Sequence, residues 1–416
     1  MRKRIVILGG GTGGTLTANR LRKALPSAEA EIIVVDQDNE HIYQPGLLFI
    51  PFGMATIDEI ARPRSRQFRS GIEFRVAPID HVDLQADEVY LGDGSSLPYD
   101  VLIVATGAVL QPEETEGLLG PGWGENIFTF YDPHGAVGLH AALEDFSQGT
   151  IAVNVVDMPI KCPVAPLEFC FLADWYFTER GIREKVNIQY ITPLDGAFTK
   201  PVASKALGQL LGEKGIEIVT EYNTGQVDEG RRRLISYDNR EIPYDMAVLI
   251  PAHGGSPYVG RSHGLGDDLG FITTDKHTLQ TVAKENVFAL GDAAGVPTSK
   301  AGSVSHFEGE IIVENVRRYL AKQPLDASFD GHSNCFIESG FHKALLIDFN
   351  YDTEPLPGHY PSDIGMPLLK ESHLNHLGKL MFQSFYWHSL LPGRDIPGIG
   401  SSMPKHGKHF QAATKS

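Results

Sequence analysis

Three cysteines stand far apart in this chain of 416 residues, and one of them has neighbours that suit thiol chemistry. Cys162 follows Lys161 and precedes a segment that we expect to be helical, from about Ala165 to Arg180. A helix N-terminus and a nearby positive charge both favour the thiolate, the nucleophilic form of the side chain. Cys162 is therefore a candidate nucleophile with a lowered pKa. Cys170, within the apolar run Phe169–Leu172, is predicted to be a core residue.

A glycine-rich turn follows the first apolar run of the chain, Arg4–Leu8. Its Gly-x-Gly-x-x-Gly spacing permits a tight turn, a close approach to a pyrophosphate and the packing of a helix on a strand. A helix from about Thr15 to Leu25 and a second strand, Glu31–Val35, complete a βαβ unit. The helix N-terminus offers N–H groups to phosphates, and the acid after the second strand can accept hydrogen bonds from a ribose. The turn predicts a dinucleotide site formed by Gly9, Gly11, Thr12, Gly13, Gly14 and Asp36.

A second αβ region begins near Thr150 but does not repeat this turn. Residues 157–166, which follow the strand Ile151–Val156, contain no glycine and three prolines. Proline removes an N–H donor where a pyrophosphate would need one. The next strand ends at Ile191 without an acid directly at its tip. We therefore expect a second Rossmann-like unit that binds no nucleotide.

Two distant segments give the chain a resemblance to the flavoproteins of the disulfide-reductase type, which have two dinucleotide folds. One is Ala105-Thr106-Gly107, and the other is the apolar strand Val287–Leu290, which ends in Gly-Asp. The resemblance covers most of residues 1–335 and implies FAD as the cofactor. It also implies that further residues contact the flavin, namely Ala105, Thr106, Gly107, Gly291, Asp292, Lys300 and Gly302.

The fold class that follows is α/β, with two Rossmann-like three-layer domains and a C-terminal membrane-associating region. We expect a discontinuous FAD-binding domain at 1–110 and 275–335, interrupted by the second Rossmann-like domain at 111–274. The C-terminal region would cover 336–416 and bind quinone and membrane. In the first domain we also expect a strand over Leu84–Leu91.

The cysteines extend the resemblance to sulfide:quinone oxidoreductase and the related flavocytochrome c sulfide dehydrogenases. In that family a redox cysteine stands where the nicotinamide motif would be, with a glutamate six residues later, as in Cys162 and Glu168. A second redox cysteine follows the helix after Gly-Asp and has an aromatic neighbour close to the quinone, as in Cys335 and Phe336. The resemblance implies a Cys162–Cys335 redox pair with Glu168 as a candidate base.

The activity implied by the resemblance is the oxidation of hydrosulfide to polysulfide or elemental sulfur, with two electrons passing through FAD to a quinone. Many members tether FAD through a cysteine near the region of Phe128–Tyr131, where this chain has none, so we expect non-covalent FAD. His134, just after that region, is either a proton carrier or a surface residue.

The C-terminal segment Leu374–Leu391 is amphipathic and rich in aromatic residues. It suits a helix lying in a membrane interface, and a packing or dimer helix is the plainer alternative. Lys379 and Phe382 have a Lys-x-x-Phe spacing that resembles quinone-site residues of the family. We expect a peripheral protein at the cytoplasmic face of the cell membrane, and a homo-oligomer is left open.

Composition limits the alternatives. The net charge of −16 argues against nucleic acid as a partner, and no metal site is predicted. No run of 18 apolar residues is present, and the apolar run after Met1–Arg4 is too short for a signal peptide, so we expect a protein that is not exported. Three rival functions remain: a type II NADH:quinone dehydrogenase, a flavocytochrome subunit that donates to a haem protein, and a regulatory flavoprotein without turnover.

Overall fold

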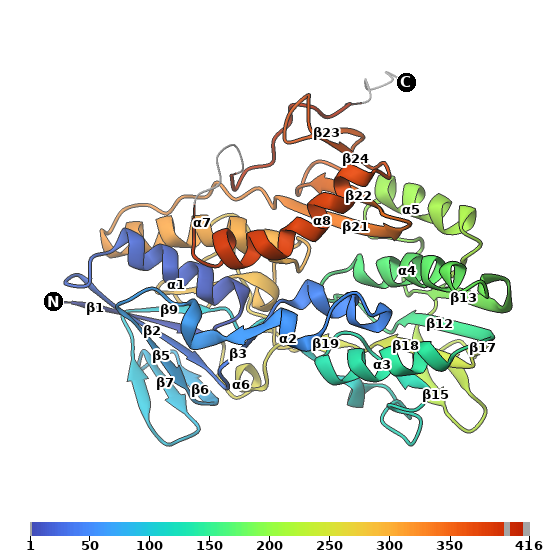
Figure 1. Ribbon diagram of the computed structural model, residues 1–416. Helices are drawn as coiled ribbons and strands as arrows, with labels where there is room; N and C mark the ends of the chain where they lie inside the picture. Colours follow the sequence, from blue (N-terminus) through green and yellow to red (C-terminus); the bar gives the residue numbers. More distant parts are fainter. Residues whose placement is uncertain (1, 395–399, 411–416) are drawn as a thin grey trace.

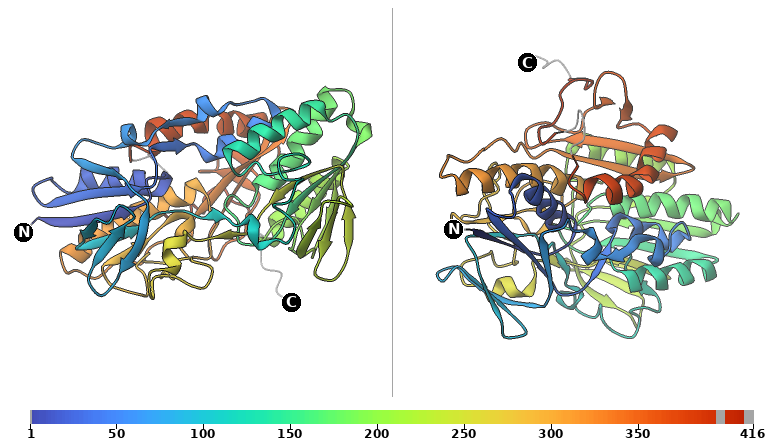
Figure 2. Two further views of the ribbon diagram at one scale, coloured as in Figure 1. Left: turned by 90° about the horizontal axis from the view of Figure 1, so that it is seen from below. Right: turned by 60° about the vertical axis from the view of Figure 1, so that its left-hand side comes forward.

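Two parallel β-sheets lie at opposite ends of the molecule, one built mainly from the blue part of the chain and the other from the green part (Figure 1, Figure 2). The computed structural model describes residues 2–394 and 400–410. The first sheet contains, in spatial order, β20 (Val287–Ala289), β9 (Val101–Val104), β1 (Lys3–Leu8), β2 (Ala30–Asp36) and β5 (Ile72–Val76). All four of its strand pairs are parallel, and β20 brings a late part of the chain beside β9.

The first sheet is the middle of three layers, because both of its faces are covered. Ile5 and Ile7 of β1 pack into one apolar cluster with side chains of α1 (Thr12–Ala24) and α7 (Gly302–Leu320). Val6 and Leu8 point to the opposite face and pack with a small antiparallel sheet. That sheet is formed by β6 (Ile79–Asp83), β7 (Glu88–Leu91) and β8 (Ser96–Pro98). A strand buried on both faces requires a continuous apolar run, which is what the sequence of β1 shows.

The second sheet has the same layered arrangement. Its parallel strands are, in spatial order, β11 (Ile127–Phe128), β18 (Met246–Ile250), β12 (Gly149–Val155), β13 (Val186–Ile191) and β14 (Glu217–Val219). One face packs with side chains of α3 (Pro133–Asp145), α4 (Ala165–Glu179) and α5 (Pro201–Glu213). The other face packs with the antiparallel strands β15 (Thr224–Asp228), β16 (Arg233–Ser236) and β17 (Glu241–Pro243). The prediction of an α/β fold with Rossmann-like parallel sheets is confirmed.

The C-terminal part of the chain forms a β-hairpin covered by a helix. Strands β21 (Ser333–Gly340) and β22 (Lys343–Phe349) pair antiparallel, and α8 (His373–Phe385) packs against both (Figure 1). A π-helical segment, η7 (Tyr386–Leu390), continues α8. A second short hairpin contains β23 (Gly358–Tyr360) and β24 (Met366–Leu368).

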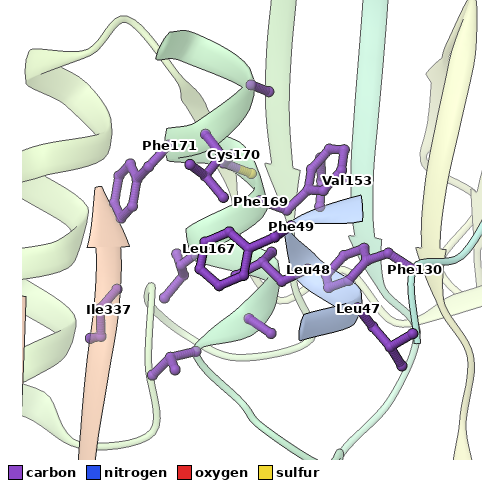
Figure 3. Packing of buried hydrophobic residues seen from close by; sticks show 14 of the residues in the cluster. Leu47, Leu48, Phe49, Phe130, Val153, Leu167, Phe169, Cys170, Phe171 and Ile337 are labelled. Atoms are coloured by element: carbon purple, nitrogen blue, oxygen red, sulfur yellow. The ribbon is translucent and has the colours of Figure 1, made fainter. Parts of the chain in front are cut away.

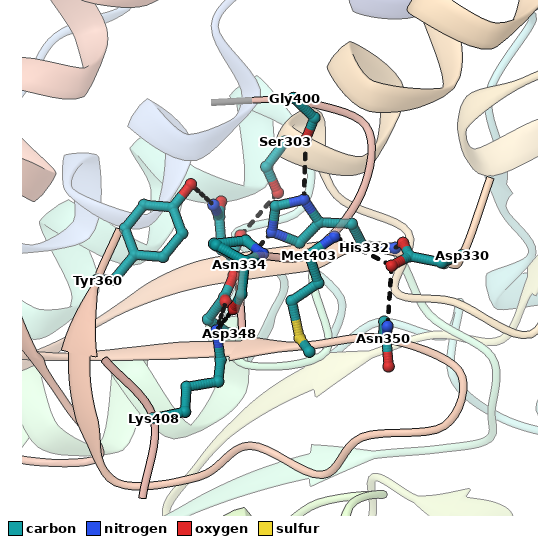
Figure 4. Close-up of polar contacts among 12 residues, drawn as sticks. Ser303, Asp330, His332, Asn334, Asp348, Asn350, Tyr360, Gly400, Met403 and Lys408 are labelled. Carbon is teal, nitrogen blue, oxygen red and sulfur yellow. Dashed lines mark hydrogen bonds and ion pairs between the residues drawn. The ribbon is translucent and has the colours of Figure 1, made fainter. Parts of the chain in front are cut away.

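The segment 400–410 is fastened to the β21–β22 hairpin by buried polar groups (Figure 4). The Nε2 atom of His332 lies 2.8 Å from Oδ1 of Asp348, and the other ring nitrogen lies 3.1 Å from the carbonyl oxygen of Gly400. Lys408 pairs with the second oxygen of Asp348, and both side chains are buried. Because Asp348 is shared between two partners, the tail and the hairpin form one packed unit.

One predicted strand is wrong. Leu84–Leu91 is not a single strand, because Asp83 ends β6 and its Oδ1 accepts hydrogen bonds from the N–H groups of Gln85 and Ala86. The chain turns there and re-enters as β7. The remaining short elements are β3 (Glu40–Ile42), β4 (Ala61–Pro63), β10 (Val109–Leu110), β19 (His253–Gly254), α2 (Ile57–Ile60), α6 (Pro257–Gly260), and the 3-10 turns η1 (Gln44–Leu48), η2 (Ile50–Phe52), η3 (Arg64–Gln67), η4 (Pro112–Glu114), η5 (Arg183–Lys185) and η6 (Gly291–Ala293).

Candidate active site

The turn after β1 is closed where the backbone packs and open at the helix N-terminus. A Cβ on Gly9 would lie 2.4 Å from the carbonyl oxygen of Ala105, and one on Gly14 would lie 1.8 Å from the carbonyl oxygen of Gly9. Neither position admits a side chain. A Cβ on Gly11 would meet no heavy atom within 4 Å, and no side chain caps α1. The first N–H groups of α1 therefore face open space, as an anion site requires.

Asp36 is fixed beside this turn. Its Oδ2 accepts a hydrogen bond of 2.6 Å from the N–H of Gly10, and its Oδ1 pairs with the guanidinium of Arg64. Thr12, the first residue of α1, shares a hydrogen bond of 2.7 Å with the hydroxyl of Tyr386. The predicted dinucleotide residues are thus gathered at the carboxyl ends of β1 and β2, which is where open α/β sheets bind ligands.

The Gly-Asp segment lies at the same edge of the first sheet. The N–H of Gly291 donates to Oε2 of Glu308 over 2.6 Å, and Lys300 Nζ donates to the carbonyl oxygen of Asp292 over 2.7 Å. Burial raises the pKa of the Asp292 carboxyl, and the charges of Lys300 and Lys161 oppose that rise. Glu308 and Lys300 therefore fix the backbone of the Gly291–Asp292 segment by one hydrogen bond each.

The residues of this edge fit a flavin dinucleotide. A Cβ on Gly107 or on Gly302 would meet no heavy atom within 4 Å, as at Gly11, so three glycines from three segments border open space. The Oε1 atom of Glu308 is buried without a hydrogen-bond partner close to Gly291. Ala105 continues the ladder, with its N–H donating to Leu8, and the Thr106 hydroxyl lies 3.3 Å from that of Tyr258.

The turn after β12 offers few free donors. Cys162 has a φ of +48°, its N–H donates to the carbonyl oxygen of Lys300 over 2.7 Å, and its own carbonyl oxygen accepts from the N–H of Ala165 over 2.9 Å. That oxygen also accepts from the hydroxyl of Tyr131 over 3.1 Å. Pro166 occupies the second position of α4 and has no N–H to give. Backbone donors that a pyrophosphate would need are therefore missing or already engaged.

Residues 300–303 hold both cysteine-bearing segments. The carbonyl oxygen of Lys300 accepts from Cys162, while the hydroxyl of Ser303 donates over 2.6 Å to the carbonyl oxygen of Asn334, the neighbour of Cys335 (Figure 4). Cys162 and Cys335 are half-buried free thiols that pack against the same apolar cluster. Two thiols that are remote in sequence are thus brought together beside the Gly-Asp segment.

The expected lowering of the Cys162 pKa is wrong. Burial raises the pKa of Cys162 to about 12, with the charge of Glu168 adding to the rise and that of Lys379 opposing it. Burial also raises the pKa of Cys335, and a charge on Cys162 raises it further. At Cys162 the loss of solvent outweighs the helix N-terminus, and at both cysteines the charge of Lys379 favours the thiolate.

Glu168 and Lys379 form a buried ion pair beside the thiols. Lys379 Nζ lies 2.7 Å from Oε1 of Glu168 and donates over 3.2 Å to the carbonyl oxygen of Phe336. The same Glu168 oxygen accepts from the N–H of Glu338 over 2.7 Å, whereas Oε2 has no partner. Burial raises the pKa of Glu168. Burial lowers the pKa of Lys379, but the charges of Glu168 and Cys162 outweigh this effect and raise it.

Known proteins resemble this chain along most of its length. A profile of the family described as pyridine nucleotide-disulphide oxidoreductase matches residues 3–141. The mitochondrial sulfide:quinone oxidoreductase of Dictyostelium discoideum is 26% identical, covering 94% of this chain and 86% of the relative. The corresponding protein of Mus musculus is 25% identical with the same coverage. The crystal structure of sulfide:quinone oxidoreductase from Aquifex aeolicus has the same fold, with a TM-score of 0.78, 19% identity, and coverage of 94% of this chain and 92% of that one.

The chain is thus similar to sulfide:quinone oxidoreductases along most of its length. The resemblance predicted from Cys162 and Cys335 is confirmed, and it is favoured over the NADH dehydrogenase and flavocytochrome alternatives. Among the described residues, no three His, Cys, Asp or Glu side chains gather where they could hold a metal ion.

The aromatic residues predicted for a quinone site lie on different sides of β21. Phe336 points away from the thiols and packs with Leu346, Met366 and Leu368. Phe382 packs against the large cluster that also contacts both cysteines, 6.3 Å from the ring of Tyr43. The structure therefore places the Phe382 ring and the Lys379 ammonium on the thiol side, and the Phe336 ring on the other.

Two further predictions concern single residues. Cys170 is fully buried in the large apolar cluster of the second unit, as predicted (Figure 3). His134 is exposed in the first turn of α3, which favours the surface alternative.

Sequence reasoning missed three polar contacts around the site. The hydroxyl of Tyr386 lies 2.7 Å from Thr12 Oγ1 and 2.7 Å from Nε2 of His41, so η7 touches the glycine turn. Nδ1 of His376 lies 2.9 Å from Oε1 of Glu338, next to the Glu168–Lys379 ion pair. All three contacts join segments that are far apart in the chain. The position of Glu338, three residues after Cys335 in an apolar strand, was the only signal in the sequence.

Helix α8 exposes its apolar side and buries polar residues. Asn375 and Lys379 are buried, whereas four apolar side chains on the outer face are 46–62% exposed, namely Leu374, Leu377, Leu380 and Met381. Within residues 2–394 and 400–410, no helix is long and apolar enough to cross a membrane. The outer face of α8 is an apolar stripe at one-turn spacing.

Proposed function

We propose that this protein oxidises hydrosulfide and passes the two electrons through FAD to a quinone. The observation that supports this proposal is the meeting of Cys162 and Cys335 at the segment 300–303, between the flavin edge and the buried Glu168–Lys379 pair. The similarity to proteins named sulfide:quinone oxidoreductase favours the same activity.

FAD would be held without a covalent bond. Residues of the glycine turn and Asp36 would bind the pyrophosphate and ribose, and the flavin end would lie along Gly107, Asp292, Lys300 and Gly302. Only three cysteines are present in the chain, and the two that face the site are assigned to the redox pair. Bound FAD supplies a two-electron acceptor beside the thiols and a donor to the quinone.

The cysteines carry the sulfur chemistry. In the oxidised pair, hydrosulfide attacks Sγ of Cys162, a new S–S bond forms, and Cys335 leaves as a thiolate. Two electrons then leave for the flavin, and Sγ of Cys335 bonds to the outer sulfur of the persulfide on Cys162. The proton of that persulfide passes to Glu168. Lys379 stabilises each thiolate by its charge, because it favours the anionic form of both cysteines. In later rounds hydrosulfide attacks the bridging sulfur next to Cys335, so that Cys335 again leaves as a thiolate and the chain on Cys162 grows by one sulfur. Attack of the Cys335 thiolate on Sγ of Cys162 finally re-forms the pair and releases the chain as polysulfide, from which elemental sulfur can form.

The quinone and the membrane would meet the protein at α8. Lys379 and Phe382 on the inner face would contact the quinone, while the outer apolar stripe would enter the interface of the bilayer. The protein would then lie peripherally on the cytoplasmic face of the cell membrane.

Vesicle binding tests this docking. A Leu377→Glu variant should lose binding to lipid vesicles yet keep activity with a water-soluble quinone, whereas Leu119→Glu, at an equally exposed leucine elsewhere, should bind normally. Equal binding of both variants contradicts the assignment.

The three rival functions differ in which features of the molecule they require. An NADH dehydrogenase needs free backbone donors after β12, where Cys162 and the prolines stand. A flavocytochrome subunit does not need the apolar stripe on α8, and a regulatory protein does not need the paired thiols.

Substitution of each cysteine tests the proposed chemistry. Cys162→Ser and Cys335→Ser should each lower sulfide-dependent quinone reduction by roughly a hundredfold or more, because a nucleophile or a leaving group is removed. Cys170→Ala is the matched control, since this thiol is buried in the core, and it should keep its activity with at most some loss of stability. Substantial activity in Cys335→Ser would remove the redox pair from the mechanism.

A further inference from the structure

The reaction proposed above requires protons at a buried place. Quinone reduction takes up two protons, whereas oxidation of hydrosulfide to the sulfur level releases one. Lys379 is a cationic group whose charge acts on both thiols, and it is buried. A lysine that gives a proton to a bound quinone must be recharged before the next turnover, so a route for protons from solvent is needed.

Glu338 lies next to this lysine on β21, three residues after Cys335. Its side chain is 1% exposed, and its backbone N–H donates to the Glu168 oxygen that binds Lys379. Lys379 and Glu168 therefore face Glu338 from α8 and α4, and their charges act on its carboxyl group. A buried acid at this position is costly unless it is paired or protonated.

His376 connects Glu338 to the surface. Its Nδ1 lies 2.9 Å from each oxygen of Glu338, and its side chain is 13% exposed. The ring also contacts that of His342, with centroids 5.6 Å apart, and His342 and His373 beside it are exposed. His376 and Lys379 stand one turn apart on α8, so acid, imidazole and ammonium are neighbours.

We propose that Glu338 and His376 form a proton path that recharges Lys379 from solvent during quinone reduction. The inference rests on the function proposed above. In each passage Lys379 gives a proton to the quinone oxygen, and Glu338 returns one to the amine. His376 then restores the proton of Glu338 and takes one from water. Two passages supply the two protons of the quinol, while the two electrons come from the thiols by way of the flavin.

The titration of these groups suits such a transfer. Burial raises the pKa of Glu338 to about 8; the charge of Lys379 opposes this rise, and the charge of Glu168 adds to it. Burial lowers the pKa of His376, and the charge of His373 lowers it further. Near neutral pH Glu338 therefore carries its proton and His376 is neutral. The path should lose protons as pH rises through about 8.

Rapid mixing separates this path from the sulfur chemistry. Flavin in the full-length protein is reduced beforehand with dithionite, so that no sulfide is needed, and is then reoxidised by quinone or by ferricyanide, which accepts electrons without protons. In Glu338→Gln, reoxidation by quinone should slow roughly tenfold at neutral pH and lose the decline above pH 8. Reoxidation by ferricyanide should match that of the wild type.

A second variant covers the outer end of the path. His376→Ala should also slow quinone reoxidation, and added imidazole should restore it, which a packing role would not explain. Equal effects with quinone and ferricyanide, or wild-type quinone rates in both variants across the pH range, would overturn the path. The proposed function fails separately, if sulfide does not reduce the flavin of the wild-type protein.

Discussion

After β1 and after β12 the chain makes a turn at the same place in two similar layered units, and the two turns differ in chemistry. The first has five glycines among residues 9–14 and leaves the N-terminus of α1 uncapped and open. The second has prolines, and its Cys162 N–H is engaged by Lys300. The same architecture therefore provides a phosphate cradle in one unit and a support for a thiol in the other.

This difference shows how one fold can serve two purposes through its turns. A pyrophosphate needs several free N–H groups around one point, which only a glycine turn leaves available. A reactive sulfur needs instead a fixed backbone and a nearby charge. In the second unit that charge comes from Lys379 of α8, a part of the chain outside both sheets.

Loss of the first turn should have the largest effect. In Gly14→Ala the new Cβ would lie 1.8 Å from the carbonyl oxygen of Gly9, so the turn cannot keep its shape. The purified variant should contain less than about a tenth of the wild-type flavin, because closely packed sites relax only partly. Gly212→Ala, in α5 of the second unit, meets no heavy atom within 4 Å and is the matched control. Flavin content is measured by absorbance, and equal content in both variants contradicts the assigned cradle.

A smaller effect should appear in the titration of Cys162. Its raised pKa predicts that alkylation of the reduced protein is slow at pH 7 and accelerates with rising pH toward about 12, as the thiolate forms. Lys379→Met removes a charge that favours the thiolate and should move this rise to still higher pH. The rate of iodoacetamide labelling at Cys162, followed by mass spectrometry, checks the shift. Fast labelling at pH 7 would mean that the helix N-terminus controls the thiol after all.

The first unit was the more predictable of the two from the sequence. Local patterns determine it: an apolar run, a glycine turn, a helix and an acid in the order that one βαβ unit requires. The strand predicted over Leu84–Leu91 failed because Asp83 binds backbone N–H groups and turns the chain, a local competition that apolar periodicity does not reveal.

The site in the second unit could be predicted only in part. Cys162 was found from its neighbours and Glu168 from the family resemblance, but the direction of the Cys162 pKa was wrong, because burial depends on segments from the whole chain. The Phe336 ring faces away from the thiols because neighbours in a strand point to opposite faces. The roles of Ser303 and Glu338 arise from contacts across the fold, which no local pattern encodes.

The comparison of the two turns is tested most directly by the electron donor that the flavin accepts. Purified protein is mixed anaerobically with sulfide or with NADH, and the flavin absorbance near its visible maximum is followed. The account predicts rapid bleaching with sulfide in the wild type, none in Cys335→Ser, and no comparable bleaching with NADH. Bleaching by NADH but not by sulfide would contradict it, because the second turn would then bind a nucleotide.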